Sequence, residues 1–483
     1  MSLIVQHRSH ISITDYTPGD CPSIENSYIY KENWQKYSVG IVYDEESHEL
    51  RMIGGNPYHL QHLSGFSIME DTTYDPFEPI SIRLQNFPRD QLQALMIQFL
   101  IGTGEYEVNK NYSQLSCNAE TGEGKTFCTI AMMTYLRVKT MIIVNRQVIQ
   151  DTWVKEITKF TDADERKILR LDSKNIHEIL EGKLDTKDYV AFVVIHRTLH
   201  NLGAEEGFET VHTLFKKLGI GLKVYDEAHR EFGNTTDVDC YTNTWKTVYL
   251  TATLKLSAPK ANYIYQYIFR HIPKFDQRKL GYTDAKKHIV MLAYFYNSHP
   301  TMKDQKRCYN ARMHYFNARN HSMYQVEDDC YFFEILDANI KKMAIKNGFR
   351  TLILVSRIAA CDEIKKFLRD NYPDLKIGVY NSSIDQKEKQ RVLDEDQVII
   401  STNSSLGESV TIKELRYVLN CEAHRNYGDQ ASGRLRKFRD KPDTICYYGE
   451  LVDRGFKSIL NQWKSRKKHY REIFKQIYEI QIN

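Results

Sequence analysis

Short apolar runs alternate with longer stretches of helical spacing along most of the chain. In the first half, these runs cover residues 140–144, 189–195, 222–225 and 247–250. In the second half, they cover residues 351–355, 376–380, 397–400, 417–419 and 444–448. Runs of this length between helical stretches are typical of buried parallel strands with helices on both faces. The pattern therefore predicts an α/β fold with two parallel-sheet domains, at residues 83–273 and 329–454.

Three segments depart from this pattern. Residues 1–82 contain short alternating runs separated by turn signals, which predicts a small, mostly β accessory domain. Residues 274–328 are polar apart from one apolar run, and we interpret them as a linker or insertion. In residues 455–483, apolar positions recur at helical spacing, which predicts a C-terminal helix packed on the second domain.

Composition narrows the class of protein. With 483 residues and 42% hydrophobic content, the chain is long and apolar enough to bury several cores. It has no apolar run of about 18 residues, so we expect no membrane partner. The nine cysteines include no Cys-x-x-Cys pair, which indicates reduced thiols and a cytoplasmic location, in the host cell if the source is a virus. A formal net charge of +4 permits a nucleic-acid partner without demanding one.

A glycine-containing loop, Ala-Glu-Thr-Gly-Glu-Gly-Lys-Thr, precedes a helical run at residues 119–126. Its glycines let backbone N–H groups curl around phosphates, and Lys125 adds a positive charge. The Thr126 hydroxyl is a candidate ligand for Mg²⁺. The loop predicts a nucleotide site formed by Ala119, Gly122, Glu123, Gly124, Lys125 and Thr126.

Two carboxylates follow the apolar run at residues 222–225. Asp226 is a candidate metal ligand, and Glu227 is a candidate for orienting an attacking water molecule. A glycine loop alone is often a simple turn before a helix. Together with this carboxylate pair, in this order, it predicts ATP hydrolysis with Mg²⁺ as cofactor.

The second domain contains no phosphate loop but has the segment Gln-Ala-Ser-Gly-Arg-Leu-Arg at residues 430–436. Arg434 and Arg436 are suited to stabilise charge on a transferring phosphoryl group, and Gln430 belongs to the same candidate catalytic segment. Taken alone, this segment is more often a solvated basic turn. Beside a nucleotide-binding first domain, the catalytic interpretation is favoured.

From about residue 85 to 450, these segments resemble the ordered motifs of superfamily 2 helicases. The resemblance implies two RecA-like motor domains that use ATP and Mg²⁺. It implies that Gln91 reads adenine and that Thr251 and Thr253 couple the ATP site to the nucleic acid. It also implies nucleic-acid contacts from Asn145, Arg146, His196, Arg197, Arg357, Thr402 and Asn403.

The chain departs from the family pattern at four places, of which the first is Ala119 where the loop usually has a glycine. Asn145 replaces the usual proline, and residues 409–411 lack the usual glycine and aspartate. The last motif is one residue shorter than usual after Arg434. Either Arg436 or Lys437 therefore takes the second arginine's place, and we favour Arg436 because its planar fork suits a phosphate.

Within the superfamily, the small N-terminal domain and short motor resemble phage branch-migration helicases of the UvsW type. This resemblance implies a monomeric motor on forked, branched or Holliday-type DNA, with recombination or replication proteins as partners. An RNA or transcription-associated helicase is one alternative, and an inactive ATP-binding scaffold is another. The intact Lys125, Asp226 and Glu227 argue against the scaffold.

Overall fold

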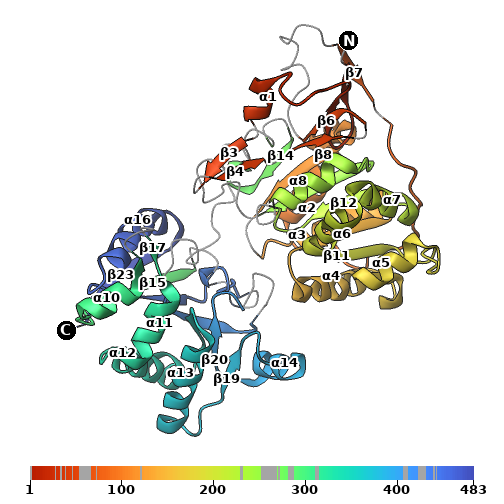
Figure 1. Cartoon of the computed structure of the whole chain (residues 1–483). Helices are drawn as coiled ribbons and strands as arrows, with labels where there is room; N and C mark the ends of the chain where they lie inside the picture. Colours follow the sequence, from red (N-terminus) through yellow and green to blue (C-terminus); the bar gives the residue numbers. More distant parts are fainter. Residues whose placement is uncertain are drawn as a thin grey trace. The chain divides into compact units, whose positions relative to one another are not determined.

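The computed structural model describes most of the chain. The described residues are 3–27, 29–32, 35–38, 40–45, 47–53, 67–71, 73–119, 122–228, 232–251, 269, 272–280, 288–310, 315–405, 412–422, 431–438, 441 and 443–482. They belong to two compact units, Met1–Tyr282 and Thr283–Asn483 (Figure 1).

The first unit is built on a parallel seven-stranded sheet in the order β10-β11-β9-β12-β13-β8-β14. Its strands are β8 (Gln114–Asn118), β9 (Thr140–Val144), β10 (Ile168–Leu171), β11 (Ala191–Ile195), β12 (Leu222–Tyr225), β13 (Lys246–Thr251) and β14 (Lys274–Asp276). Its helices are α2 (Gln91–Ile101), α3 (Lys125–Leu136), α4 (Gln147–Phe160), α5 (Ser173–Leu180), α6 (His196–Glu206), α7 (Phe208–Leu218) and α8 (Phe232–Tyr241), with short helical turns at Gly104–Asn111, Glu165–Lys167 and Gln277–Leu280.

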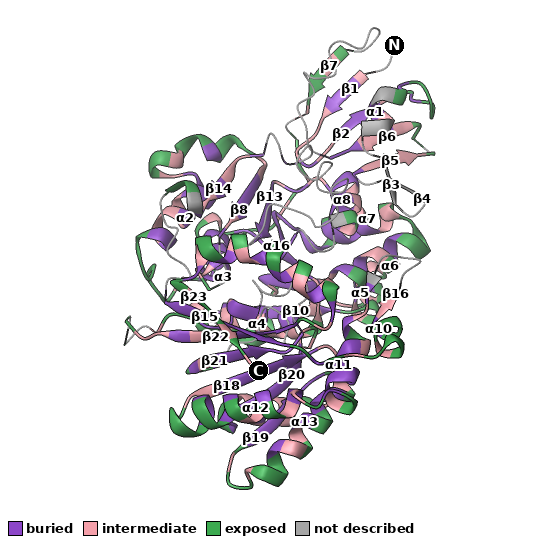
Figure 2. Ribbon diagram, turned by 90° about the vertical axis from the view of Figure 1, so that its left-hand side faces the viewer, coloured by how far each residue is buried: buried purple, intermediate pink, exposed green. Residues whose placement is uncertain are grey.

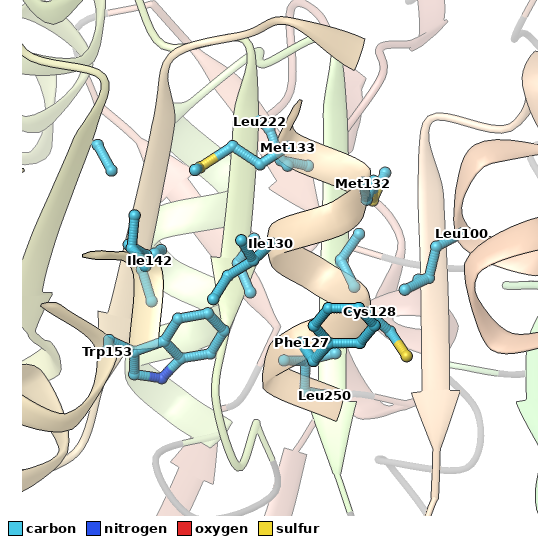
Figure 3. Close-up of a cluster of buried hydrophobic side chains, with 14 of the residues drawn as sticks. Leu100, Phe127, Cys128, Ile130, Met132, Met133, Ile142, Trp153, Leu222 and Leu250 are labelled. Atoms are coloured by element: carbon cyan, nitrogen blue, oxygen red, sulfur yellow. The ribbon is translucent and has the colours of Figure 1, made fainter. Parts of the chain in front are cut away.

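Alternate residues of these strands enter two different cores, one on each face of the sheet. Ile142 and Val224 belong to a core that includes residues of α2, α3 and α4, while Ile143 and Tyr225 belong to a core with residues of α5, α6 and α7. Figure 3 shows the first of these cores, with Trp153 of α4 and Ile130 of α3 beside the sheet. Because both faces are covered, the strands read as continuous apolar runs in the sequence.

The N-terminal segment forms a mixed five-stranded sheet in the order β5-β6-β2-β1-β7, which confirms a mostly β fold. The strands are β1 (Leu3–Gln6), β2 (Ile11–Ile13), β5 (Ile41–Asp44), β6 (Glu49–Met52) and β7 (Ser67–Glu70), with helix α1 (Pro22–Ser27) and the hairpin β3 (Ile29–Glu32) and β4 (Gln35–Ser38) between them. Among the described strand pairs of this sheet, β1 and β7 are parallel and the others are antiparallel.

This N-terminal sheet shares its core with the parallel sheet. Ile13 and Leu50 are buried in the same cluster as Ile143 and Tyr225. At the surface, Arg51 of β6 pairs with Glu209 of α7 at 3.1 Å. The segment is therefore packed as part of the first unit.

The second unit contains another parallel seven-stranded sheet, in the order β19-β20-β18-β21-β22-β15-β23. Its strands are β15 (Ile289–Tyr296), β18 (Arg350–Val355), β19 (Ile377–Tyr380), β20 (Val398–Thr402), β21 (Leu415–Asn420), β22 (Cys446–Asp453) and β23 (Gln476–Gln481). Its helices are α10 (Met302–Cys308), α11 (Ala318–Glu327), α12 (Phe332–Ile340) with a π-helical extension at Lys341–Lys346, α13 (Ile358–Asn371), α14 (Gln386–Glu395) and α16 (Lys457–Ile473). Two short strands, β16 (Tyr309–Asn310) and β17 (Tyr315–Phe316), pair antiparallel. The central strands of both sheets are buried, and the outer faces of the helices are exposed (Figure 2).

The structure differs from the sequence-based interpretation in two segments. Residues 274–328, interpreted as a linker or insertion, supply β14 to the first sheet and the fully buried β15 to the second. Polar residues around each strand hide this contribution in the sequence. After α16 ends at Ile473, the chain forms β23 beside β15, where a helix was expected. The two parallel sheets themselves confirm the predicted fold class, whereas the predicted domain boundaries stay predictions.

Candidate active site

The predicted residues of the first unit gather at the carboxyl ends of neighbouring strands. Ala119 follows β8, Thr251 ends β13, Asp226 follows β12 and Asn145 follows β9. The backbone N–H of Ala119 donates to the carbonyl of Thr251 at 3.2 Å, so the start of the glycine loop is fastened to the end of β13. Ligand sites of open parallel sheets form at this edge.

The glycine loop adopts backbone conformations that require its glycines. Gly122 has φ 93° and Gly124 has φ 90°, both in the left-handed region. A Cβ atom on Gly124 would also lie 2.1 Å from Nε2 of Gln93. Any side chain at this position would therefore displace both the loop and Gln93.

Lys125 begins α3 and points back along the loop. Only 8% of it is exposed, and its ammonium donates to the carbonyl of Ala119 at 2.6 Å. Thr126 lies beside it in the first turn of the helix. A helix N-terminus with a lysine and a hydroxyl is suited to hold phosphates.

Gln93, rather than Gln91, contacts the loop. Its side-chain amide donates to the carbonyl of Glu123 at 3.2 Å and accepts the backbone N–H of Arg89 at 2.8 Å. Gln91 is exposed at the first position of α2. The sequence contained a signal that Gln93 turns back toward the start of α2. Asp90 caps the helix and Gln93 follows three residues later, which is the spacing of a capping box.

Arg89 also binds the glycine loop, a contact that was not predicted from the sequence. Its guanidinium donates to the carbonyl of Gly122 at 3.3 Å and to the carboxylate of Glu123 at 3.2 Å. Predicted loop residues Gly122 and Glu123 are thus held by the segment before α2, whereas residues 120 and 121 lie outside the described part.

The two carboxylates of the predicted hydrolytic site lie directly after β12. The backbone N–H of Asp226 donates to the carbonyl of Ile143, and that of Ala228 donates to Leu250, both at 3.0 Å. Glu227 between them has φ 51°, a left-handed conformation that is unusual for glutamate, and 7% of it is exposed. Strained backbone of this kind concentrates at functional sites.

Trp153 of α4 holds Asp226 in place. Its indole N–H donates to Oδ2 of Asp226 at 2.9 Å, while its ring is buried in the core shown in Figure 3. A buried tryptophan needs an acceptor for its N–H, and this requirement was the available signal for a partner.

These residues fit Mg²⁺ as it is usually bound with a nucleotide. Such an ion takes one or two protein oxygens, and phosphates and water complete its shell. The Asp226 carboxylate and the Thr126 hydroxyl provide oxygens of this kind. Among the described residues, no group of three or more His, Cys, Asp or Glu side chains is arranged to hold a metal ion alone.

The predicted nucleic-acid contacts of the first unit differ in accessibility. Asn145 and Arg146 lie between β9 and α4, and Arg197 is exposed in α6. His196 is only 2% exposed and stacks on Tyr225. Burial lowers the pKa of His196 to about 3, so its ring is neutral. This burial argues against the contact expected from His196.

In the second unit, Arg357 and Asn403 follow adjacent strands. Arg357 caps α13 after β18, Thr402 ends β20, and the backbone N–H of Asn403 donates to the carbonyl of Val355 at 3.0 Å. These three predicted contacts are thus at one sheet edge.

The segment predicted to carry the catalytic arginines is described only from residue 431 to 438. Arg434 is buried and Arg436 is exposed, as is Lys437. Predicted residues Gln430 and Thr253 lie outside the described residues.

A buried ionic cluster at the same edge of the second sheet was not anticipated. His321 of α11 bonds the Glu422 carboxylate at 2.8 Å and lies 3.6 Å from Asp453. Burial alone lowers the pKa of His321, but the charges of Glu422 and Asp453 outweigh it and raise the pKa to about 10. The next residue, Ser322, accepts the N–H of Ser356, beside Arg357, at 3.3 Å. Helix α11 thus contacts Glu422, which follows β21, and Ser356, the residue before the predicted contact Arg357.

No described helix is both long and apolar enough to cross a membrane. Two family models match the sequence. The res subunit of type III restriction enzymes matches residues 89–256, and the helicase conserved C-terminal domain matches residues 333–439. No curated protein matches the chain.

Several solved structures align with this chain. Dbp5 of S. cerevisiae bound to RNA and ADP BeF3 aligns with 81% of this chain and 89% of its own, at 13% identity and a TM-score of 0.52. A fragment of a putative HsdR subunit of a type I restriction enzyme from Vibrio vulnificus aligns with 82% of this chain and 70% of its own, at 12% identity and a TM-score of 0.53. T4 UvsW aligns with 100% of this chain and 99% of its own, at 13% identity and a TM-score of 0.36.

The two family models together cover more than half of the sequence. The first matches residues of the first parallel sheet, and the second matches residues of the second parallel sheet. The glycine loop and the carboxylates lie within the first matched range. The chain is a superfamily 2 helicase, an enzyme that hydrolyses ATP.

Proposed function

We propose that this helicase is a DNA motor that acts on forked or branched DNA, in branch migration, recombination or fork repair. The main observation in support of a motor is that the glycine loop, the carboxylate pair and Thr251 lie together at one edge of the first sheet. Ala119 of the loop is bonded to Thr251, and Asp226 follows the strand next to that of Thr251. A change in the bound nucleotide at the loop therefore reaches the end of β13 directly.

ATP binds with its phosphates at the loop in this proposal. Lys125 contacts the β- and γ-phosphates, Thr126 and Asp226 hold Mg²⁺, and Glu227 orients the attacking water. The contact between Gln93 and the loop makes Gln93 a stronger candidate than Gln91 for sensing the base. Arg434 and Arg436 stabilise the charge that develops during phosphoryl transfer, as arginine fingers do.

DNA is gripped through its phosphates. Asn145, Arg146 and Arg197 supply contacts from the first unit, and Arg357, Thr402 and Asn403 supply them from the second. Contacts of this type set affinity without reading sequence. The N-terminal sheet selects branched substrates, and the protein works as a monomer in the cytoplasm with recombination or replication proteins.

ATPase rates with a panel of nucleic acids test this proposal. Single-stranded, forked and Holliday-type DNA would be compared with single-stranded and duplex RNA, and Lys125→Ala would report the background. We expect the largest stimulation with forked or Holliday-type DNA, together with strand displacement. Stimulation by RNA alone would replace the proposal with an RNA or transcription-associated helicase. Absence of stimulation by every member would contradict a motor.

A further inference from the structure

Helix α16 presents two chemically different faces. Its inner face is buried and its outer face carries cations, and this outer face is visible as exposed segments in Figure 2. The buried residues are Ile459, Trp463, Arg466 and Tyr470. The exposed cations, which we call the basic stripe, are Lys457, Lys464, Lys468 and Arg471.

The inner face anchors the helix firmly to the second sheet. The Arg466 guanidinium donates to the buried Glu450 carboxylate, and the Tyr470 hydroxyl donates to the same carboxylate at 3.2 Å. The ring of Trp463 packs edge-on against Phe295 at 5.7 Å between centroids. The apolar side of α16 is therefore occupied by its own domain.

The cations of the basic stripe lie along one line. Their spacing of seven, four and three residues places them within an arc of roughly 60° and over a length of roughly 21 Å on an α-helix. The helix contains a single acidic residue, Glu472. Within the described part of the chain, no cation of the stripe has a carboxylate within ion-pair distance, whereas neighbouring Lys467 pairs with Glu479 at 2.6 Å.

The stripe begins near the edge that carries the predicted nucleic-acid contacts. Strand β22 ends at Asp453, so α16 starts at the carboxyl edge of the sheet, where Thr402 ends β20. The helix then returns toward the amino edge, where β23 begins in parallel with β15. The cations therefore extend away from the motif-bearing edge along the outside of the lobe.

We propose that the basic stripe of α16 binds the phosphate backbone of duplex nucleic acid, outside the helicase motifs. A duplex is favoured because its two strands give one negative charge per about 1.7 Å of axis. A membrane surface fits less well, since interfacial helices insert an apolar face that α16 has already buried. The inference rests on the proposed function for the use of DNA as substrate.

A fourfold variant, Lys457→Gln, Lys464→Gln, Lys468→Gln and Arg471→Gln, tests the stripe in the full chain. Its matched control carries the same charge change at other exposed lysines of the second unit: Lys342→Gln, Lys346→Gln, Lys366→Gln and Lys387→Gln. Thermal melting would verify that both variants fold. Duplex DNA affinity would be measured against salt concentration, along with ATPase activity without DNA.

We expect the stripe variant to bind duplex DNA at least tenfold more weakly than wild type. Its log–log salt slope should be shallower by ~0.9 for each lost phosphate contact, or roughly 3 to 4 in all. The control should retain the wild-type slope, and the ATPase rate without DNA should not change in either variant.

Equal losses in the stripe variant and the control would overturn the inference, because overall charge would then explain them. Unchanged duplex binding by the stripe variant would also overturn it while leaving the DNA motor intact. Loss of binding only to vesicles containing phosphatidylserine would assign the stripe to membranes instead. If wild type bound duplex RNA through the stripe but no DNA, the stripe would stand and the proposed DNA function would fail.

Discussion

The indole N–H of Trp153 and the carboxylate of Asp226 are joined by a hydrogen bond of 2.9 Å. Trp153 belongs to α4, which begins directly after the predicted nucleic-acid contacts Asn145 and Arg146. Asp226 is the proposed Mg²⁺ ligand. Trp153 thus connects α4, the helix that follows the predicted nucleic-acid contacts, to the proposed Mg²⁺ ligand of the ATP site.

Replacement of Trp153 by phenylalanine should keep the packing but remove this donor. A hydrogen bond to a charged group contributes about 1.5–3 kcal/mol, so turnover should fall about tenfold or more if the orientation of Asp226 limits it. ATPase rates against Mg²⁺ concentration would show a raised Mg²⁺ requirement. Trp463→Phe, in the second unit, is the size-matched control and should change neither quantity. A wild-type Mg²⁺ profile for Trp153→Phe would mean that Asp226 needs no such support.

Glu227→Gln should bind ATP but hydrolyse it very slowly, because an amide cannot orient and deprotonate water as a carboxylate does. The shape of the side chain is kept, so the strained backbone at this position should be unaffected. Nucleotide binding and single-turnover hydrolysis would separate the two effects. Normal turnover by this variant would show that another group orients the water.

Arg434→Ala and Arg436→Ala should each reduce turnover by about 10³-fold with little loss of ATP affinity, as expected for arginine fingers. Lys437→Ala is the matched control, since Lys437 is exposed beside Arg436. The measurement is kcat with saturating ATP and DNA. A larger effect of Lys437→Ala than of Arg436→Ala would assign the second position to the lysine.

Because of the His321 cluster, the stability of the fold should decrease as the pH rises into the alkaline range. The pKa of His321 is raised from 6.5 to about 10, so its stabilising charge is fully present below pH 6.5 and is lost as pH rises toward 10. Nearby Asp329, whose pKa burial raises to about 6, titrates mainly below this pH range. The melting temperature of wild type should therefore fall between pH 7 and 10 more steeply than that of His321→Gln. Parallel curves for the two proteins would show that His321 is neutral in the fold.

Deletion of residues 1–82 should destabilise the whole first unit. Ile13 and Leu50 are buried with Ile143 and Tyr225, so the deletion would expose apolar residues beside the ATP site. Solubility, thermal melting and single-strand-stimulated ATPase of the truncated protein would be compared with wild type. A stable truncated ATPase that fails only on branched DNA would instead identify the segment as a separate substrate domain.

The positions of the predicted site residues at one sheet edge follow from a few residues whose chemistry restricts where they can lie, whereas their roles stay predictions. Gly124 and Lys125 indicate a phosphate loop through backbone freedom and charge, and Asp226 follows a short, mostly apolar run of the length typical of a buried strand. Gln93 was missed because its role depends on the direction in which a side chain leaves the first helical turn. Residue type does not specify that direction unless the cap at Asp90 is considered as well.

Contacts between distant segments were less predictable. Strand β15 lies between β22 and β23, and its position depends on pairings with residues far along the chain. The same holds for Trp153 and Asp226, which are separated by 73 positions. The sequence reveals that such residues are buried or polar, but their partners follow only from the assembled sheet.

The core that joins the N-terminal sheet to the first lobe limits how this protein can be re-engineered. Arg51 contacts Glu209 and lies over the ring of Tyr241, so its surroundings are built from both segments. A different substrate-selecting segment grafted before residue 83 would have to bring matching partners for α7 and α8. The N-terminal segment is therefore not an exchangeable module, and variation in it must be matched by changes in the motor that it covers.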